Sequence, residues 1–103
     1  MGDRICLTFV NGERRSPVLY SHWDGRDLLD RAREFWETYR TLVRDDPANW
    51  MVNFIAWLTG TVADGGYYLY PDEERSCSPD DNGFWEFDTS TGECRQTKKG
   101  DYE

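Results

Sequence analysis

The sequence has little of what enzymes and metal sites usually need. Its 103 residues contain a single histidine, His22, and three cysteines. Cys6, Cys77 and Cys94 show no CxxC spacing, and an odd number of cysteines at irregular intervals is a poor disulfide framework. A Cys₃His zinc site made from these four residues is disfavoured, because such sites normally contain ligand pairs at short spacing. We therefore expect free thiols and no bound metal.

Long apolar runs and nucleotide-binding motifs are missing too. No run approaches the roughly 20 apolar residues that span a bilayer, and the first residues lack the apolar region of a signal peptide. Gly65-Gly66 is not followed by the Lys-Ser or Lys-Thr of a phosphate-binding loop. Residues 80–83 lack the alternating ligands of a calcium loop. We expect a cytoplasmic protein without a cofactor and without membrane contact.

Positive charge is also scarce. Lysine and arginine number 12 against 20 acidic residues, so the net charge is −8. A protein of this charge is repelled by phosphate backbones, and direct nucleic-acid binding is therefore disfavoured. A basic surface on a host protein is a more natural partner, while the oligomeric state stays open.

Aromatic side chains, in contrast, are abundant, at 16% of the residues. Each ring can bury roughly 150–250 Å², so a chain of this length can form one core without disulfides. We expect a single domain over residues 1–97, followed by a frayed tail at residues 98–103.

Two strands are predicted, at about 4–10 and 14–23. In the first, Ile5, Leu7 and Phe9 share one face, with Cys6, Thr8 and Val10 on the other. Asn11-Gly12 between the two strands predicts a type I′ hairpin turn. Pro17 cannot donate to a ladder, so it should lie at an edge or a bulge.

Helical spacing predicts one helix at about 27–44, with Asp27 as N-cap, and another at about 47–59. The second helix should begin with Asp46 as N-cap and Pro47 at the first position, and should stop at Gly60.

Short strands are expected at 67–70, 84–89 and 93–97, with a loop over residues 71–83. The element order is β-β-α-α-β-β, with 93–97 as a further strand. We predict an α+β fold in which two helices pack on one face of an antiparallel sheet.

The charge is distributed unevenly along the chain. Residues 61–93 contain nine acidic residues and one arginine, whereas residues 1–60 are nearly balanced. This acidic block indicates either a solvated surface that keeps the domain soluble or a surface that imitates phosphates and docks on a basic groove. On the second interpretation the partner-binding residues are acidic side chains: Asp72, Glu73, Glu74, Asp80, Asp81, Glu86 and Asp88.

Aromatic residues give an alternative, a site that stacks on a small ligand such as a nucleotide. Its members would be Tyr20, His22, Trp23, Tyr67, Tyr68 and Tyr70. For His22 a structural role is favoured, with a hydrogen bond to the following turn and Trp23 packed under the first helix. Catalysis by His22 as general base ranks last, because no nucleophile or second catalytic partner lies at a sequence spacing typical of a catalytic site. We predict no catalytic residue.

Three segments carry a resemblance to a known group of proteins: residues 19–25 (LYSHWDG), 66–69 (GYYL) and 84–88 (FWEFD). They resemble small proteins of phages, archaeal viruses and proviruses, in which a hairpin ending in YxHWxG precedes two helices, a Gly-Tyr strand and a last strand. The resemblance implies no activity. It implies a viral or proviral accessory protein, and an anti-CRISPR-like inhibitor that masks a basic nucleic-acid-binding surface of a host defence complex is one such function.

Overall fold

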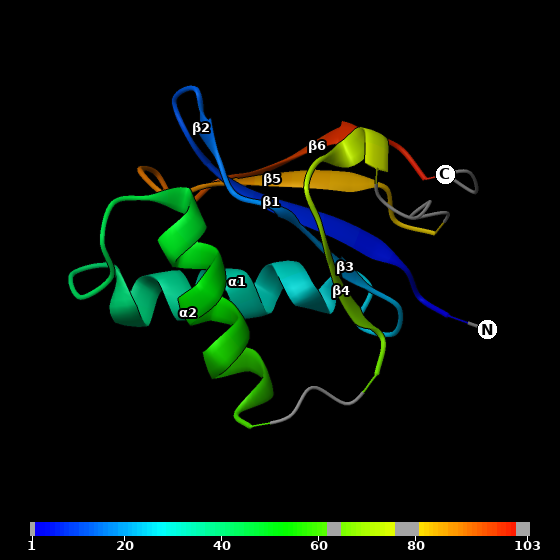
Figure 1. Cartoon of the computed structure of the whole chain (residues 1–103), viewed down its shortest axis with the longest axis horizontal. Coiled ribbons are helices and arrows are strands. Elements are labelled where there is room, and N and C mark those ends of the chain that lie inside the picture. Colours follow the sequence, from blue (N-terminus) through cyan, green and yellow to red (C-terminus); the bar gives the residue numbers. More distant parts are fainter. Residues whose placement is uncertain (1, 62–64, 76–80, 101–103) are drawn as a thin grey trace.

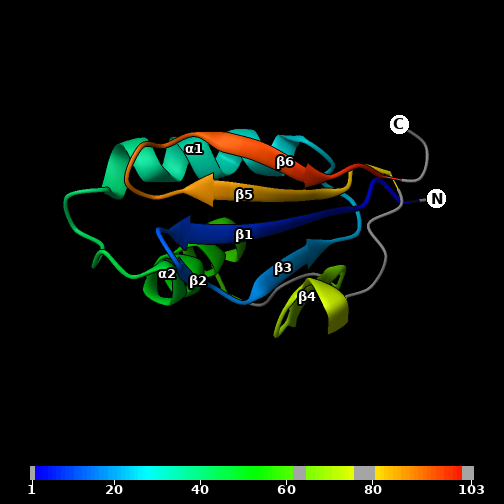
Figure 2. The same cartoon turned by 90° about the horizontal axis from the view of Figure 1, so that it is seen from above.

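The computed structural model describes residues 2–61, 65–75 and 81–100. Within them the chain forms helices α1 (Asp27–Tyr39) and α2 (Pro47–Thr59) and a short 3₁₀ helix, η1 (Glu73–Arg75). The strands are β1 (Ile5–Asn11), β2 (Arg14–Arg15), β3 (Val18–Ser21), β4 (Tyr67–Tyr70), β5 (Phe84–Asp88) and β6 (Cys94–Lys98). The fold is α+β, with α1 and α2 below one face of the sheet (Figures 1 and 2).

The sheet is mixed, so the prediction of an antiparallel sheet was wrong. The strand order is β4-β3-β1-β5-β6, and β2 pairs with β1. β1 and β5 run parallel, with Cys6 beside Phe84 and Val10 beside Asp88, while the other pairs are antiparallel. β1 is the central strand and is buried on both faces from Ile5 to Val10. Burial on both faces is typical of a strand with parallel pairing, and only Thr8 interrupts the apolar run from Ile5 to Val10.

The N-terminal hairpin differs from its prediction by one residue. Asn11 pairs with Arg14, so Gly12 and Glu13 form the turn. Only Gly12 has a positive φ, 62°, which fits a type II′ turn rather than a type I′ turn.

The expected strand over residues 14–23 is divided into β2 and β3 by Ser16 and Pro17. The Ser16 hydroxyl accepts a hydrogen bond from the Phe9 N–H at 3.0 Å, and the Ser16 N–H donates to the Phe9 carbonyl at 2.9 Å. The Ser16 hydroxyl thus replaces a backbone carbonyl as the partner of the Phe9 N–H where the strand is interrupted. Pro17, which has no N–H to donate, lies at this interruption.

Helix α2 has the predicted bounds. The Asp46 carboxylate caps it by accepting from the Ala48 N–H at 3.0 Å, and Gly60 ends it with φ 75°.

Helix α1 is shorter than predicted. It begins at Asp27, but Arg26 occupies the N-cap position and no side chain caps the helix. After Tyr39 the N–H groups of Leu42 and Val43 both donate to the Tyr39 carbonyl, which closes a tight turn. The chain then returns to the hairpin, where the Arg14 guanidinium donates to the Asp45 carbonyl.

The main core lies between the sheet and the two helices. Phe9 is fully buried at its centre, with its ring edge-on to Phe54 at 5.4 Å and to Phe87 at 5.5 Å. The other buried members come from β1, β3 and both helices: Ile5, Leu7, Leu19, Leu28, Ala32, Phe35, Trp36, Trp50 and Met51. Offset and edge-to-face aromatic pairs stabilise such a core beyond simple burial.

We call the side of the sheet away from the helices the open face. A second, smaller core of Cys6, Val18, Tyr20 and Phe84 lies there, with Tyr70 packed against it. η1 lies across this side, opposite α1 and α2 (Figure 1). At the C-terminal end Lys98 belongs to β6, so the expected frayed tail does not begin at this residue; residues 101–103 lie outside the described part.

Candidate functional site

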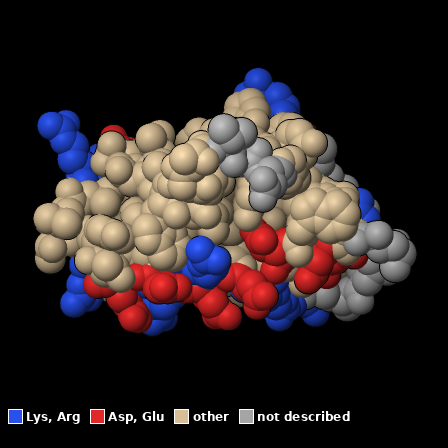
Figure 3. Space-filling view, turned by 90° about the horizontal axis from the view of Figure 1, so that it is seen from below, with Lys and Arg blue, Asp and Glu red and all other residues tan. Residues whose placement is uncertain are grey.

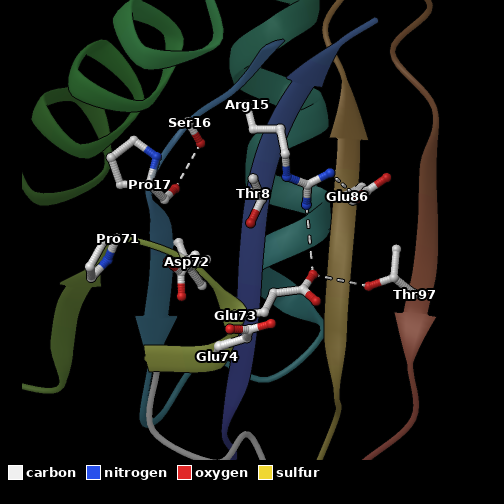
Figure 4. A pocket seen from close by; sticks show the side chains of 11 residues that line it. Thr8, Arg15, Ser16, Pro17, Pro71, Asp72, Glu73, Glu74, Glu86 and Thr97 are labelled. Carbon is white, nitrogen blue, oxygen red and sulfur yellow. Dashed lines mark hydrogen bonds and ion pairs between the residues drawn. The ribbon is translucent and has the colours of Figure 1, made fainter. Parts of the chain in front are cut away.

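Part of the acidic block lines a cavity on the open face, which we call the acidic pocket (Figure 4). Its volume is about 760 Å³. Carboxylates reach it from two separate segments, Asp72, Glu73 and Glu74 from the η1 region and Glu86 from β5. Val18 and the two prolines Pro17 and Pro71 form an apolar wall. The fold thus gathers around one cavity acidic side chains that the sequence separates by a loop.

Glu86 is the buried centre of this arrangement, with its side chain 7% exposed. Its two oxygens accept from different arginines, at 2.5 Å from Arg15 Nη1 and 2.8 Å from Arg95 Nη2. Burial works to raise the pKa of Glu86, but the hydrogen bonds from Arg15 and Arg95 outweigh it and hold the pKa below its usual value. Glu86 is therefore an ionised, internally paired carboxylate.

The carboxylates of the η1 region are paired to different degrees. Asp72 binds Arg75, with Oδ2 2.8 Å from Nη2, and this hydrogen bond lowers the pKa of Asp72. Glu73 Oε1 lies 3.7 Å from Arg15 Nη2 and accepts a hydrogen bond of 3.4 Å from the Thr97 hydroxyl. In the described part of the chain the exposed Glu74 carboxylate has no ion pair or hydrogen bond.

The remaining predicted partner-binding residues lie apart from the pocket. Asp81 accepts from the backbone N–H of Arg4 at 2.9 Å and pairs with its side chain. Asp88 is on the open face but caps the following turn, and its hydrogen bonds from Ser90 lower its pKa. Asp80 lies outside the described residues.

Five of the six residues of the alternative ligand site form a continuous aromatic cluster beside β3 and β4: Tyr20, His22, Trp23, Tyr68 and Tyr70. Tyr20 is its buried base, 5.8 Å from the Tyr68 ring, and Trp23 stands edge-on to His22 at 4.4 Å. Tyr68 is 52% exposed. Tyr67 faces the other side and packs against the main core, so it does not belong to the cluster.

Two expectations for the YSHWDG segment were wrong. Trp23 does not pack under the first helix; it is 60% exposed and lies over Gly66, where an added Cβ would come within 2.7 Å of the indole. His22 shares a 2.8 Å hydrogen bond with the Tyr20 hydroxyl through Nδ1 instead of bonding the next turn. Asp24 stabilises the turn, since its carboxylate accepts from both Ser21 and Tyr67.

The described cysteines face opposite sides of the sheet. Cys6 belongs to the small core of the open face, whereas Cys94 packs against the main core. Burial raises the pKa of the Cys94 thiol to about 11, with Arg33 opposing the shift. Cys77 lies outside the described residues. The two thiols cannot share one ligand in this geometry.

The helix side of the molecule has a different surface. Figure 3 shows acidic and basic side chains together along the margin formed by α1, with a broad uncharged area over α2. Arg31 pairs with Glu34 and Arg33 with Glu37 along α1, whereas Pro47–Thr59 contains no charged residue. The helix side therefore presents paired charges and an uncharged helix, in contrast to the carboxylates of the acidic pocket.

Seven residues that line the pocket were not among the predicted site residues: Thr8, Arg15, Ser16, Pro17, Val18, Pro71 and Thr97. Thr8 has a sequence signal, because strand alternation puts it on the same face as Cys6 and Val10. Thr97 had none, since its place depends on the pairing of β6 with β5.

In the described residues no helix has the length and apolar character needed to cross a membrane. No protein-family model, curated protein or solved structure matches the chain. The candidate sites therefore rest on their geometry alone.

Proposed function

We propose that this chain is a non-enzymatic protein-binding module whose open face docks on a basic surface of a partner protein. The observation that carries the proposal is the convergence of carboxylates from the η1 region and β5 on one cavity. Complementary charge of this kind increases association rates and fixes the register of a complex. The exposed Trp23 and Tyr68 of the aromatic cluster supply the large side chains that anchor protein interfaces.

The resemblance to viral and proviral accessory proteins favours one form of this function. A host complex that binds nucleic acid has a basic surface, and a module that covers this surface would act as an anti-CRISPR-like inhibitor. The module itself would not bind nucleic acid, because its net charge of −8 repels phosphates.

A displacement experiment tests the docking face. Deca-arginine bound to a fluorescent single-stranded DNA serves as the model of a basic surface, and fluorescence anisotropy reports release of the DNA when the protein is added. We expect Glu73→Gln/Glu74→Gln to require about 3–10 times more protein for half-displacement than the wild type, because the open face loses two carboxylates. Added salt should weaken the wild-type competition.

Glu34→Gln/Glu37→Gln is the matched control, since it changes the net charge equally on the outer side of α1. It should displace the DNA as the wild type does. Equal weakening of both variants would mean that net charge alone drives the competition and would refute a docking face.

The aromatic cluster supports a second candidate function, binding of a small planar ligand. Tyr20, His22, Trp23 and Tyr68 lie together, and Trp23 and Tyr68 are open to solvent. Base–aromatic stacking stabilises binding by about 1–3 kcal/mol per base. Saturation-transfer NMR with adenosine tests this candidate. We expect saturation transfer from the wild-type protein to adenosine and its loss in Trp23→Ala. Saturation transfer that Trp23→Ala leaves unchanged would contradict the site. The candidate ranks second because the acidic surroundings oppose phosphorylated nucleotides.

A further inference from the structure

The acidic pocket is lined by a buried hydroxyl group as well as by charged side chains. Thr8 is 2% exposed, yet its side chain lines the pocket, with Oγ1 on the pocket side of β1 (Figure 4). In the described part of the chain this hydroxyl has no hydrogen-bond partner, and it is open to the cavity rather than sealed. The other buried serine and threonine residues, Ser16, Ser21 and Thr89, all form hydrogen bonds. Thr8 thus offers a free donor and acceptor to a ligand.

The carboxylates of the pocket outnumber the arginines that pair with them by one. Four carboxylates and one guanidinium, that of Arg15, line it. Two more arginines bind from outside, Arg75 on Asp72 and Arg95 on Glu86. The remaining carboxylate is Glu74, which has no cation in the described residues. The pocket therefore has the acceptors for one further positive group.

We propose that the acidic pocket binds a single arginine side chain of the partner, with its guanidinium donating to Glu74 and to the Thr8 hydroxyl. This inference rests on the proposed function and assigns to it a particular anchor. Arg15 is an internal precedent: its guanidinium already bridges Glu86 and Glu73 at the side of the same cavity.

A guanidinium fits this pocket better than an ammonium ion does. The acceptors come from different elements, β1 and the η1 region, and a planar fork with five N–H donors can reach several of them at once. The methylene groups of the arginine would lie on the apolar wall of Val18, Pro17 and Pro71. At about 760 Å³ the cavity has room for the side chain and part of its backbone.

The test is an NMR titration of the ¹⁵N-labelled chain with N-acetyl-arginine amide, using the uncharged N-acetyl-citrulline amide as the control ligand. We expect saturable shifts of the Thr8, Val18, Glu74 and Thr97 amides with the arginine derivative and none with the citrulline derivative. Thr8→Val and Glu74→Gln should each weaken binding about 3–10-fold, the range for one lost hydrogen bond.

Glu13→Gln is the matched control, because Glu13 is an exposed acid at the hairpin tip and does not line the pocket. It should bind as the wild type does. Thr8→Val replaces the hydroxyl by a methyl group of similar size. A thermal unfolding midpoint close to that of the wild type is the check that this variant folds.

Two results would overturn the inference. Thr8→Val binding as tightly as the wild type would show that the hydroxyl takes no part, and equal binding of N-acetyl-lysine amide would exclude selectivity for guanidinium. Either result would leave the docking face intact if the deca-arginine competition still depended on Glu73 and Glu74. Failure of that competition, with a working arginine pocket, would instead refute the wider docking face.

Discussion

At the residue scale, Glu86 shows how an acidic residue can be structural and still belong to a candidate site. It is buried on the open face, and Arg15 and Arg95 satisfy its two oxygens from β2 and β6, on either side of β5. The sequence placed Glu86 among the partner-binding acids because of its position in an acidic block. The structure places it beneath the pocket, where it holds Arg15 and thereby shapes the cavity wall.

Glu86→Gln should lower the free energy of unfolding by about 1–2 kcal/mol at pH 7. This is the low end for hydrogen bonds to a charged group, because both arginines are largely exposed. The pKa of Glu86 is lower in the folded chain, so its contribution is complete above the usual value of 4.5 and is lost as pH falls through the folded pKa.

The difference between wild type and Glu86→Gln should therefore shrink between pH 7 and about pH 3 in urea unfolding curves. Glu34→Gln, an exposed control on α1, should differ little from the wild type at either pH. A difference that is unchanged or larger at low pH would contradict the pairing of Glu86.

At the scale of elements, the turn between β5 and β6 is joined tightly to α1. The Trp36 indole N–H donates to the Thr89 carbonyl at 2.8 Å, and Gly92 lies against the same ring. Gly92 has φ 76°, and a Cβ added there would be 2.6 Å from Trp36 Cζ3. The turn thus needs glycine both for its backbone conformation and for space.

Gly92→Ala should destabilise the chain more than Gly12→Ala does. Gly12 is also a hairpin glycine with positive φ, 62°, but an added Cβ there meets nothing within 4 Å. Gly12→Ala should cost about 1–2 kcal/mol for the left-handed conformation, and Gly92→Ala about 1–3 kcal/mol more for displacing the indole. Urea unfolding of both variants measures the two losses of stability. Equal losses would show that the Trp36 indole can be displaced at no cost in free energy.

Local signals in the sequence were enough to predict several elements. Asp46, Pro47 and Gly60 determine the bounds of α2 through interactions within a few residues, and the structure has those bounds. The end of α1 could not be predicted in this way, because Arg14 holds the chain after it from a distant hairpin. The parallel pairing of β1 with β5 depends on a contact between residues about 80 apart, and the composition of each strand does not encode it.

The same distinction applies to the candidate site. The acidic and aromatic residues were visible as runs in the sequence, and the structure brings five of the six aromatic residues together. Tyr67 was misplaced because neighbours in a strand face opposite sides. Strand alternation gives the face of Thr8, but the order of the strands is what brings Thr8 and Thr97 to the acidic pocket.

At the scale of the whole molecule, folding removes much of the charge separation seen along the chain. Arginines from outside the acidic block pair with its members, as Arg4 does with Asp81 and Arg15 does with Glu86. The surface is therefore not a uniform array of negative charge. Within the described residues the pocket on the open face keeps one carboxylate without an ion pair, Glu74, and the other side of the molecule presents an uncharged helix, α2.

The proposed docking of the open face on a basic partner can be mapped residue by residue. The most direct measurement is a map of amide chemical shifts of the ¹⁵N-labelled wild type titrated with deca-arginine. We expect the shifts to concentrate on the open-face residues of β1, β5 and β6 and on η1, and added salt to reduce them. Shifts concentrated on the outer side of α1, or spread evenly over the exposed acids of both faces, would contradict it.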